Sequence, residues 1–222
     1  EAQLLNPPSG YVFNTNQSPF ISTSEAYCPK AEDYDSTMGY MQVDNNRGLR
    51  YRELMEEAGK IDYEKFKEIK FDRRYPDSLY VYYCENFNDM FSLSPQKYPD
   101  VSAGIEIIRN WDKGTEAENQ GAAMMLLINQ YLFEYALENH IAFRRTTWDE
   151  KLFVDAIDYA QDHLMKHFGT LNVKLGELQR HVRGEKDWPI AGGPDVISAM
   201  YSKPWKKGRR RSRLGDSYIQ LI

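Results

Sequence analysis

The sequence predicts an α+β fold, namely a mostly helical segment flanked by short strands. Residues 47–168 carry apolar side chains at helical spacing, whereas the stretches on either side are irregular and rich in Pro, Gly and Asn. The 222 residues are 41% hydrophobic and 14% aromatic, which suffices for a packed core and argues against disorder. We therefore expect one domain over residues 1–222, with a strand and irregular loop in 1–46, a helical region in 47–168, and loops and strands in 169–222.

The N-terminal part begins with a short apolar run that ends in amides, in the stretch GYVFNTNQSPF at residues 10–20. Residues 11–13 predict a short strand, and Pro19 closes the loop that follows it. Residues 21–46 show no period and are rich in Asp, Asn, Ser and Tyr. A long irregular segment of this kind is often functional.

Helical periodicity dominates the middle of the chain. Gly59 is placed to end the first helix, and Asp62 is placed to cap the second. Thr115 with Glu118 fits a capping box before the most apolar stretch, AAMMLLINQYLFEYAL, which we expect to be buried on all sides. The predicted helices cover residues 46–59, 62–71, 77–93, 100–111, 115–140 and 148–168.

The pattern becomes irregular again after Gly169. We expect a helical turn in residues 175–181, a strand in 188–202 interrupted by two glycines, a basic solvated loop in 203–213, and a final strand in 215–222. An apolar strand that stops at a terminus would expose the unpaired N–H and C=O groups of a sheet edge. We therefore expect the natural protein to continue past the last residue, and its start at Glu rather than Met fits a processed or excised piece.

Composition excludes several classes of protein. A formal net charge of −5 argues against a general nucleic-acid or membrane-surface role. No run approaches the roughly 18 apolar residues of a membrane span, and the start lacks a signal-peptide pattern. Cys28 and Cys84 are too few for a disulfide framework, so one disulfide and two separate thiols both remain open.

Two local patterns have both a functional and a structural interpretation. His163 and His167 are four residues apart, which is metal-ligand spacing, but no third ligand is evident, and a partly buried pair near a helix end is favoured. The basic run KPWKKGRRRSR, with Trp205 inside it, could bind nucleic acid. Because the rest of the chain is acidic, a solvated loop is the preferred interpretation.

Four stretches together resemble a known family. GYVFNTNQSP, RGLRYRELM, LGELQRHVRGEKDWPIAGGPDVIS and GDSYIQLI occur in this order. They are similar to the β-chain of the penicillin acylase family of N-terminal nucleophile hydrolases, and within it to the aculeacin and acyl-homoserine-lactone acylase branch. The resemblance covers nearly the whole chain, and it implies that the flanking strands join the αββα core of that fold.

The resemblance also implies roles for two residues. In the family, an N-terminal Ser attacks an amide carbonyl with its own α-amine as base, and an Asn side chain helps to form the oxyanion hole. Asn16 matches that Asn, while Asn14 is expected to be structural. Arg47, at the start of the helix, matches an active-site supporting Arg, and Arg50 is a weaker candidate. The matching positions of the first motif are Gly10, Tyr11, Asn14, Asn16 and Pro19.

The first position is Glu1 rather than Ser, Thr or Cys, so we expect a segment that is inactive by itself. Its implied partners are the remainder of the β-chain, the α-chain and a small-molecule amide, such as a penicillin, an acyl-homoserine lactone or a lipopeptide. Those substrates belong to antibiotic biosynthesis or quorum quenching. We expect no cofactor, nucleic acid or membrane contact in this segment. The resemblance implies a possible calcium ion in the full-length parent, held mainly by residues outside this stretch, and a parent in the periplasm or outside the cell.

Two hypotheses from other classes stand beside the hydrolase. The first is a helical interaction module without a catalytic part. The second, which is weaker, is a nucleic-acid binder that uses the basic run.

Overall fold

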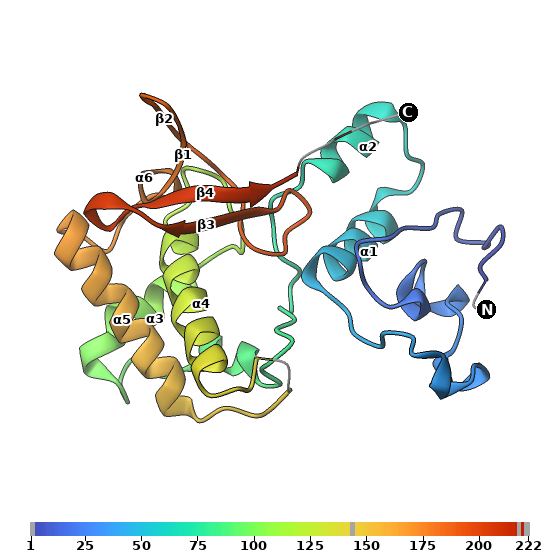
Figure 1. Cartoon of the computed structure of the whole chain (residues 1–222), viewed down its shortest axis with the longest axis horizontal. Coiled ribbons are helices and arrows are strands. Elements are labelled where there is room, and N and C mark those ends of the chain that lie inside the picture. Colours follow the sequence, from blue (N-terminus) through green and yellow to red (C-terminus); the bar gives the residue numbers. More distant parts are fainter. Residues whose placement is uncertain (1–2, 143–144, 217–218, 220–222) are drawn as a thin grey trace.

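The computed structural model describes residues 3–142, 145–216 and 219, and it shows helices on one side of a small mixed sheet (Figure 1). The predicted α+β class is confirmed. The helices are α1 (Asn46–Ala58), α2 (Tyr63–Lys70), α3 (Ser102–Arg109), α4 (Gly121–Glu138), α5 (Glu150–Phe168) and α6 (Leu175–Leu178). The strands are β1 (Gln179–Arg183), β2 (Lys186–Pro189), β3 (Met200–Pro204) and β4 (Arg210–Gly215).

The core lies between α3, α4 and α5. Every residue from Gly121 to Ile128 in α4 is buried, as expected for a helix that is apolar on all sides. The buried arc of α5, which includes Phe153 and Ile157, packs against it. Each large apolar side chain that is fully buried in this way stabilises the fold by roughly 1.5–3 kcal/mol. Within the described residues, no helix combines the length and the apolar character that crossing a membrane requires.

The sheet has the strand order β2-β1-β4-β3. β1 pairs with β2 and β3 pairs with β4 in antiparallel fashion, whereas β1 and β4 are parallel. Arg210 at the start of β4 is buried, and its guanidinium donates to the side chain of Gln130 in α4 and to the carbonyl of Ser202 in β3. The sheet is therefore attached to the helices by polar as well as apolar contacts.

The N-terminal part differs from the prediction. No strand forms at residues 11–13; instead, residues 3–45 are irregular and contain four short 3₁₀ turns, at Pro19–Ile21, Glu25–Tyr27, Ala31–Asp33 and Ser36–Met38. The Phe13 N–H donates to the Ser22 carbonyl at 2.9 Å, but no ladder follows. Asn, Ser and Thr side chains satisfy the main chain here in place of a neighbouring strand.

The prediction of a helix over residues 77–93 is also wrong, because only a 3₁₀ helix at Phe87–Ser92 forms there. Amide side chains bind the main chain of this segment. Asn88 accepts from the Leu79 N–H at 3.0 Å and donates to its carbonyl at 2.8 Å. Such side-chain bonds compete with helical hydrogen bonds.

The capping box expected at Thr115 and Glu118 does not form. The Thr115 N–H donates to the Arg73 carbonyl at 2.9 Å, which ties Thr115 to a neighbouring segment, and α4 starts only at Gly121. By contrast, Asp62 caps α2 as predicted, since its carboxylate accepts from the Lys65 N–H at 2.9 Å. Gly59 follows α1 with a φ of 60°, in the left-handed region that suits glycine.

The C-terminal part forms strands at other positions than predicted. The basic run is not a loop but a hairpin, in which β3 and β4 are joined by a 3₁₀ turn at Lys206–Gly208. The strand expected over 188–202 is irregular between Pro189 and Met200. Most of the final strand expected at 215–222 lies outside the described residues.

Candidate functional site

The amide-rich turn at residues 14–17 gives each amide a different role. Asn14 Oδ1 accepts from the Asn16 N–H at 2.8 Å, which closes a turn. Asn16 has a φ of 66°, a left-handed conformation that Asn tolerates better than most residues. The Gln17 side chain is buried and donates to the carbonyls of Phe13 and Ile21. Gln17 therefore holds the loop from inside, while Asn16 projects outward.

The first turn of α1 holds this turn in place. Asn45 caps α1 by accepting from the Gly48 N–H at 2.8 Å, and its Nδ2 donates to the Thr15 carbonyl at 2.9 Å. The Thr15 hydroxyl donates to Asn45 Oδ1 at 3.0 Å. A Cβ at Gly48 would lie 3.0 Å from an Asp44 oxygen and 3.1 Å from the Thr15 hydroxyl, so a larger residue there would push these side chains apart by a few tenths of an ångström. The position of Asn16 is thus set by the helix.

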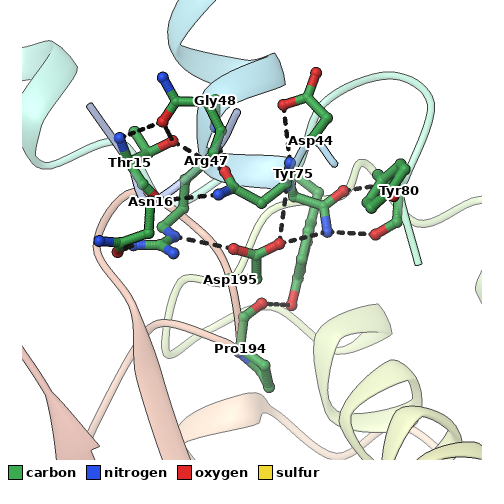
Figure 2. A network of polar contacts seen from close by, with 12 residues as sticks. Thr15, Asn16, Asp44, Arg47, Gly48, Tyr75, Tyr80, Pro194 and Asp195 are labelled. Carbon is green, nitrogen blue, oxygen red and sulfur yellow. Dashed lines mark hydrogen bonds and ion pairs between the residues drawn. The ribbon is translucent and has the colours of Figure 1, made fainter. Parts of the chain in front are cut away.

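Asn16 and Arg47 meet directly, as Figure 2 shows. Arg47 Nη1 donates to Asn16 Oδ1 at 3.2 Å, and Arg47 Nε donates to Asp195 Oδ1 at 2.9 Å. The Arg47 and Asp195 side chains are each 27% exposed, so this ion pair is partly shielded from water. Within the described residues, Asn16 Nδ2 has no protein acceptor. Because Arg47 holds the amide oxygen, the amide nitrogen is turned away from the helix.

Asp195 is held from two further sides (Figure 2). Its Oδ2 accepts from the Asn46 N–H at 2.8 Å and from Asn46 Nδ2 at 3.0 Å. Asp195 has a φ of 60° and follows Pro194, whose carbonyl accepts from the Tyr75 hydroxyl at 2.6 Å. Burial raises the pKa of Tyr75, and the carboxylate of Asp195 raises it further. The phenol therefore remains a hydrogen-bond donor at neutral pH.

Asn46 connects this cluster to the segment around Tyr80. The Tyr80 N–H donates to Asn46 Oδ1 at 2.7 Å, and Asn46 Nδ2 donates to the Tyr80 carbonyl at 2.8 Å. The Asn46 side chain is buried and uses both ends of its amide in the same way as a strand neighbour would. The start of α1 thereby joins three distant segments: residues 14–17, 80 and 194–195.

Arg50, the weaker candidate, does not join this cluster through any described contact. Its guanidinium forms two hydrogen bonds with the Asp72 carboxylate, at 3.2 and 3.1 Å, and one with Glu53 at 3.1 Å. Burial alone would lower the pKa of Arg50, but its hydrogen bonds with Asp72 and Glu53 outweigh burial and raise it. Arg50 therefore stabilises α1, whereas Arg47 binds the exposed side-chain amide of Asn16.

The other histidine and cysteine patterns lie elsewhere. His163 and His167 have ring centroids 4.7 Å apart, and His163 Nε2 lies 2.7 Å from the Gly208 carbonyl at the tip of the β3–β4 hairpin. Among the described residues, no group of three or more His, Cys, Asp or Glu side chains is placed to hold a metal ion. Cys28 and Cys84 are both unpaired thiols.

Sequence reasoning missed Asp195 and Asn46. Asp195 lies in the stretch GGPDV, inside the strand predicted over residues 188–202, and Asn46 is only the first residue of a predicted helix. One signal was available: a cation at a helix start opposes the helix dipole unless a carboxylate neutralises it. That mismatch at Arg47 pointed to an acidic partner, but not to its position in the chain.

The cluster can stabilise negative charge on an oxygen atom. A carboxamide N–H is neutral, so it stabilises an oxyanion without bringing a charge that must be desolvated. A comparison with protein families identifies the family of the chain. The family model for penicillin amidase matches residues 1–222, which is the entire sequence. The amide hydrolases of that family are processed into more than one chain. This protein belongs to the penicillin amidase family.

Proposed function

We propose that this chain is a segment of an amide hydrolase and that Asn16 contributes a donor to its oxyanion hole. One observation carries the proposal: Arg47 holds Asn16 Oδ1 at 3.2 Å and so turns Nδ2 outward, with no acceptor among the described residues. An amide locked in this orientation is a preorganised hydrogen-bond donor. Preorganised donors act on the charge that develops in the transition state.

The proposed reaction is attack on a substrate amide carbonyl by a nucleophile supplied from outside this segment. As the tetrahedral intermediate forms, the carbonyl oxygen becomes an oxyanion, and Asn16 Nδ2 donates to it. Arg47 positions Asn16, and Asp195 in turn positions Arg47 through the 2.9 Å bond to Nε. The Asp195 carboxylate balances the charge of the Arg47 guanidinium. The oriented Asn16 N–H is therefore the group that donates to the oxyanion as its charge develops.

The resemblance supports a parent with an N-terminal nucleophile at the start of its β-chain. Its partners would be the α-chain and the rest of the β-chain, and its substrate an N-acyl amide such as a penicillin, an acyl-homoserine lactone or a lipopeptide. Calcium would be held by residues outside this segment. We place the parent in the periplasm or outside the cell, in keeping with related acylases.

The test is Asn16→Ala in the full-length parent, with Asn172→Ala as a matched control at an exposed position outside the cluster. Loss of one oxyanion donor typically costs 10²–10³-fold in kcat, about 3–4 kcal/mol of barrier. We expect that loss for Asn16→Ala, little change in KM, and a small fall in melting temperature, because Ala tolerates a φ of 66° less well than Asn. If turnover stays within about threefold of the control, the oxyanion role is wrong and a non-catalytic helical module becomes the better interpretation.

A further inference from the structure

The outer face of the β3–β4 hairpin is exposed beside the candidate site. Along each strand, side chains alternate between the two faces. Ser202 and Arg210 point toward the helices, where the Arg210 guanidinium donates to both the hydroxyl and the carbonyl of Ser202. Their sequence neighbours Tyr201, Lys203 and Arg211 therefore lie on the opposite face, and all three are exposed. Leu214, which is also exposed, joins this face because it pairs with Tyr201 across the register shift.

This face begins at the candidate site. The Met200 N–H donates to the Gly193 carbonyl at 3.0 Å, which joins the start of β3 to the turn that carries Asp195. The next residue, Tyr201, is the first of this face: burial raises the pKa of its phenol, the nearby Asp195 carboxylate raises it further, and the nearby Arg47 guanidinium lowers it. The register shifts between Tyr201 and Ser202, and bulges of this kind often redirect a side chain next to an active site.

An apolar pair occupies the part of this face that is nearest the site. Tyr201 and Leu214 are directly opposite each other across the two strands. Tyr201 is 41% exposed and Leu214 60% exposed, so both present apolar surface to solvent.

A pair of cations follows along the strands. Lys203 and Arg211 are also directly opposite each other, and like charges in that position destabilise a sheet. Within the described part of the chain, neither has an ion-pair partner. Arg180, which is next to Arg211 across the parallel pair, differs in this respect because the Asp187 carboxylate neutralises it at 2.7 Å. The Lys203–Arg211 pair therefore lacks an anion that its neighbour already has.

We propose that this face selects amide substrates that carry a carboxylate: Tyr201 and Leu214 contact an apolar stretch of the substrate, and Lys203 with Arg211 binds its carboxylate. Two residues along a strand span about 7 Å, so the anion would lie about 7 Å beyond the apolar contact. This inference rests on the proposed hydrolase function, because the substrate must reach the face from the amide held at Asn16.

The experiment compares substrate pairs on the full-length parent. Each pair shares one acyl group and an ω-amino acid leaving group, with the end of the leaving group either a carboxylate or an uncharged carboxamide. The aliphatic spacer is lengthened step by step, and kcat/KM is measured for both members. We expect the carboxylate to be preferred by about tenfold at one intermediate spacer length, and the preference to shrink in high salt.

The variant Lys203→Glu should abolish that preference. It also places opposite charges on register-paired residues, so we expect the fold to be retained and the melting temperature to rise slightly. The double variant Lys203→Gln with Arg211→Gln should also lose the preference for the carboxylate substrate. Lys206→Glu with Lys207→Glu, at the tip of the same hairpin, is the matched control and should keep the preference.

The outcomes separate the two proposals. Hydrolysis of both members at equal rates for every spacer length would overturn the carboxylate site while leaving the hydrolase intact. A preference that survives in both the Glu and the Gln variants would overturn it as well. If the wild-type parent hydrolyses no amide in the panel, the proposed function itself is wrong.

Discussion

The irregular N-terminal part and the helical core are held together by different forces. Residues 3–45 contain no helix longer than a short 3₁₀ turn, and their geometry depends on side chains that bind the main chain. The core of α3, α4 and α5 depends on apolar burial, with Met124, Leu127 and Leu132 at 0% exposure. Figure 1 shows the two parts on opposite sides of the molecule, with α1 beside the first.

The comparison teaches where function and stability reside. A net hydrogen bond contributes about 0.5–1.5 kcal/mol and requires defined geometry, whereas burial contributes more and tolerates small shifts. Asn16 lies in the part that depends on geometry, and hydrogen bonds hold it to Arg47 in α1 and, through Arg47, to Asp195. Substitutions in the core should therefore change stability far more than turnover, and substitutions around Asn16 should do the opposite.

The largest effect on stability is expected from Phe153→Ala. Phe153 is 1% exposed and packs against Phe87 and Trp148. Removing a buried aromatic ring leaves a cavity and costs about 3–5 kcal/mol of unfolding free energy. Denaturant titration of the full-length parent measures this loss, and turnover per folded molecule should not change. A turnover loss as large as that of Asn16→Ala would contradict the separation of the two parts.

Asp195→Asn should affect both stability and turnover. The carboxylate accepts two hydrogen bonds from Asn46 and one from Arg47, and the neutral amide weakens all of them. We expect about 1–3 kcal/mol lower unfolding free energy. Misplacement of Asn16 by an ångström should lower kcat by up to about 10²-fold. Full turnover in a folded Asp195→Asn protein would mean that Arg47 holds Asn16 without help.

A smaller loss is expected from Asn45→Ala, which removes the cap of α1 and its two bonds to Thr15. Loss of an N-cap typically costs about 1 kcal/mol. Because the same side chain fixes the turn at Asn16, kcat should fall as well. The control is Asp62→Ala, which removes the cap of α2 at similar cost without touching the site. Equal turnover in the two variants would contradict the role of Asn45 in positioning.

The smallest effect concerns pH. Burial lowers the pKa of His163, and His167, Arg210 and Lys166 lower it further, while its bond to the Gly208 carbonyl opposes them. The native state thus binds this proton less readily than the unfolded chain. Above the ordinary pKa of 6.5, His163 is neutral in both states and costs the fold nothing. As the pH falls through 6.5 toward the lower pKa of the folded state, the unfolded chain takes up the proton first, and the free energy of unfolding decreases.

Unfolding free energies from about pH 8 to about pH 5, measured for the wild type and for His163→Gln, isolate this contribution. The wild type should lose more stability than the variant as the pH falls. Parallel curves would show that the native environment does not disfavour the charged ring. Turnover per folded molecule should respond little, since His163 lies in α5 and contacts the hairpin tip, outside the Asn16–Arg47–Asp195 cluster.

Long, strongly periodic segments could be predicted from the sequence. The apolar stretch of α4, the arc of α5 and the cap at Asp62 follow from spacing and capping chemistry alone. Prediction failed where a side chain replaces a main-chain partner. Asn88 and Asn46 hold the segment around Tyr80 in a non-helical conformation although its aromatic spacing resembles a helix.

Prediction of the site was also partial, for a related reason. The sequence placed Asn16 and Arg47 together by resemblance, and the structure shows them in contact. It gave no sign that Asp195 completes the chain of contacts, because 148 positions separate that carboxylate from Arg47. Spacing rules describe neighbours within one element, whereas this ion pair joins a helix start to a distant turn.

The buried guanidinium of Arg210 has a consequence for motion. Within the described residues it is satisfied by uncharged oxygens, from Ser202 in β3 and Gln130 in α4, rather than by a carboxylate. If the β3–β4 hairpin separated from α4, the buried Arg210 guanidinium would lose these hydrogen-bond acceptors. Partial separation therefore costs free energy. The main-chain amides of β3 and β4 should consequently exchange with deuterium as one cooperative unit, at a rate set by a single opening event.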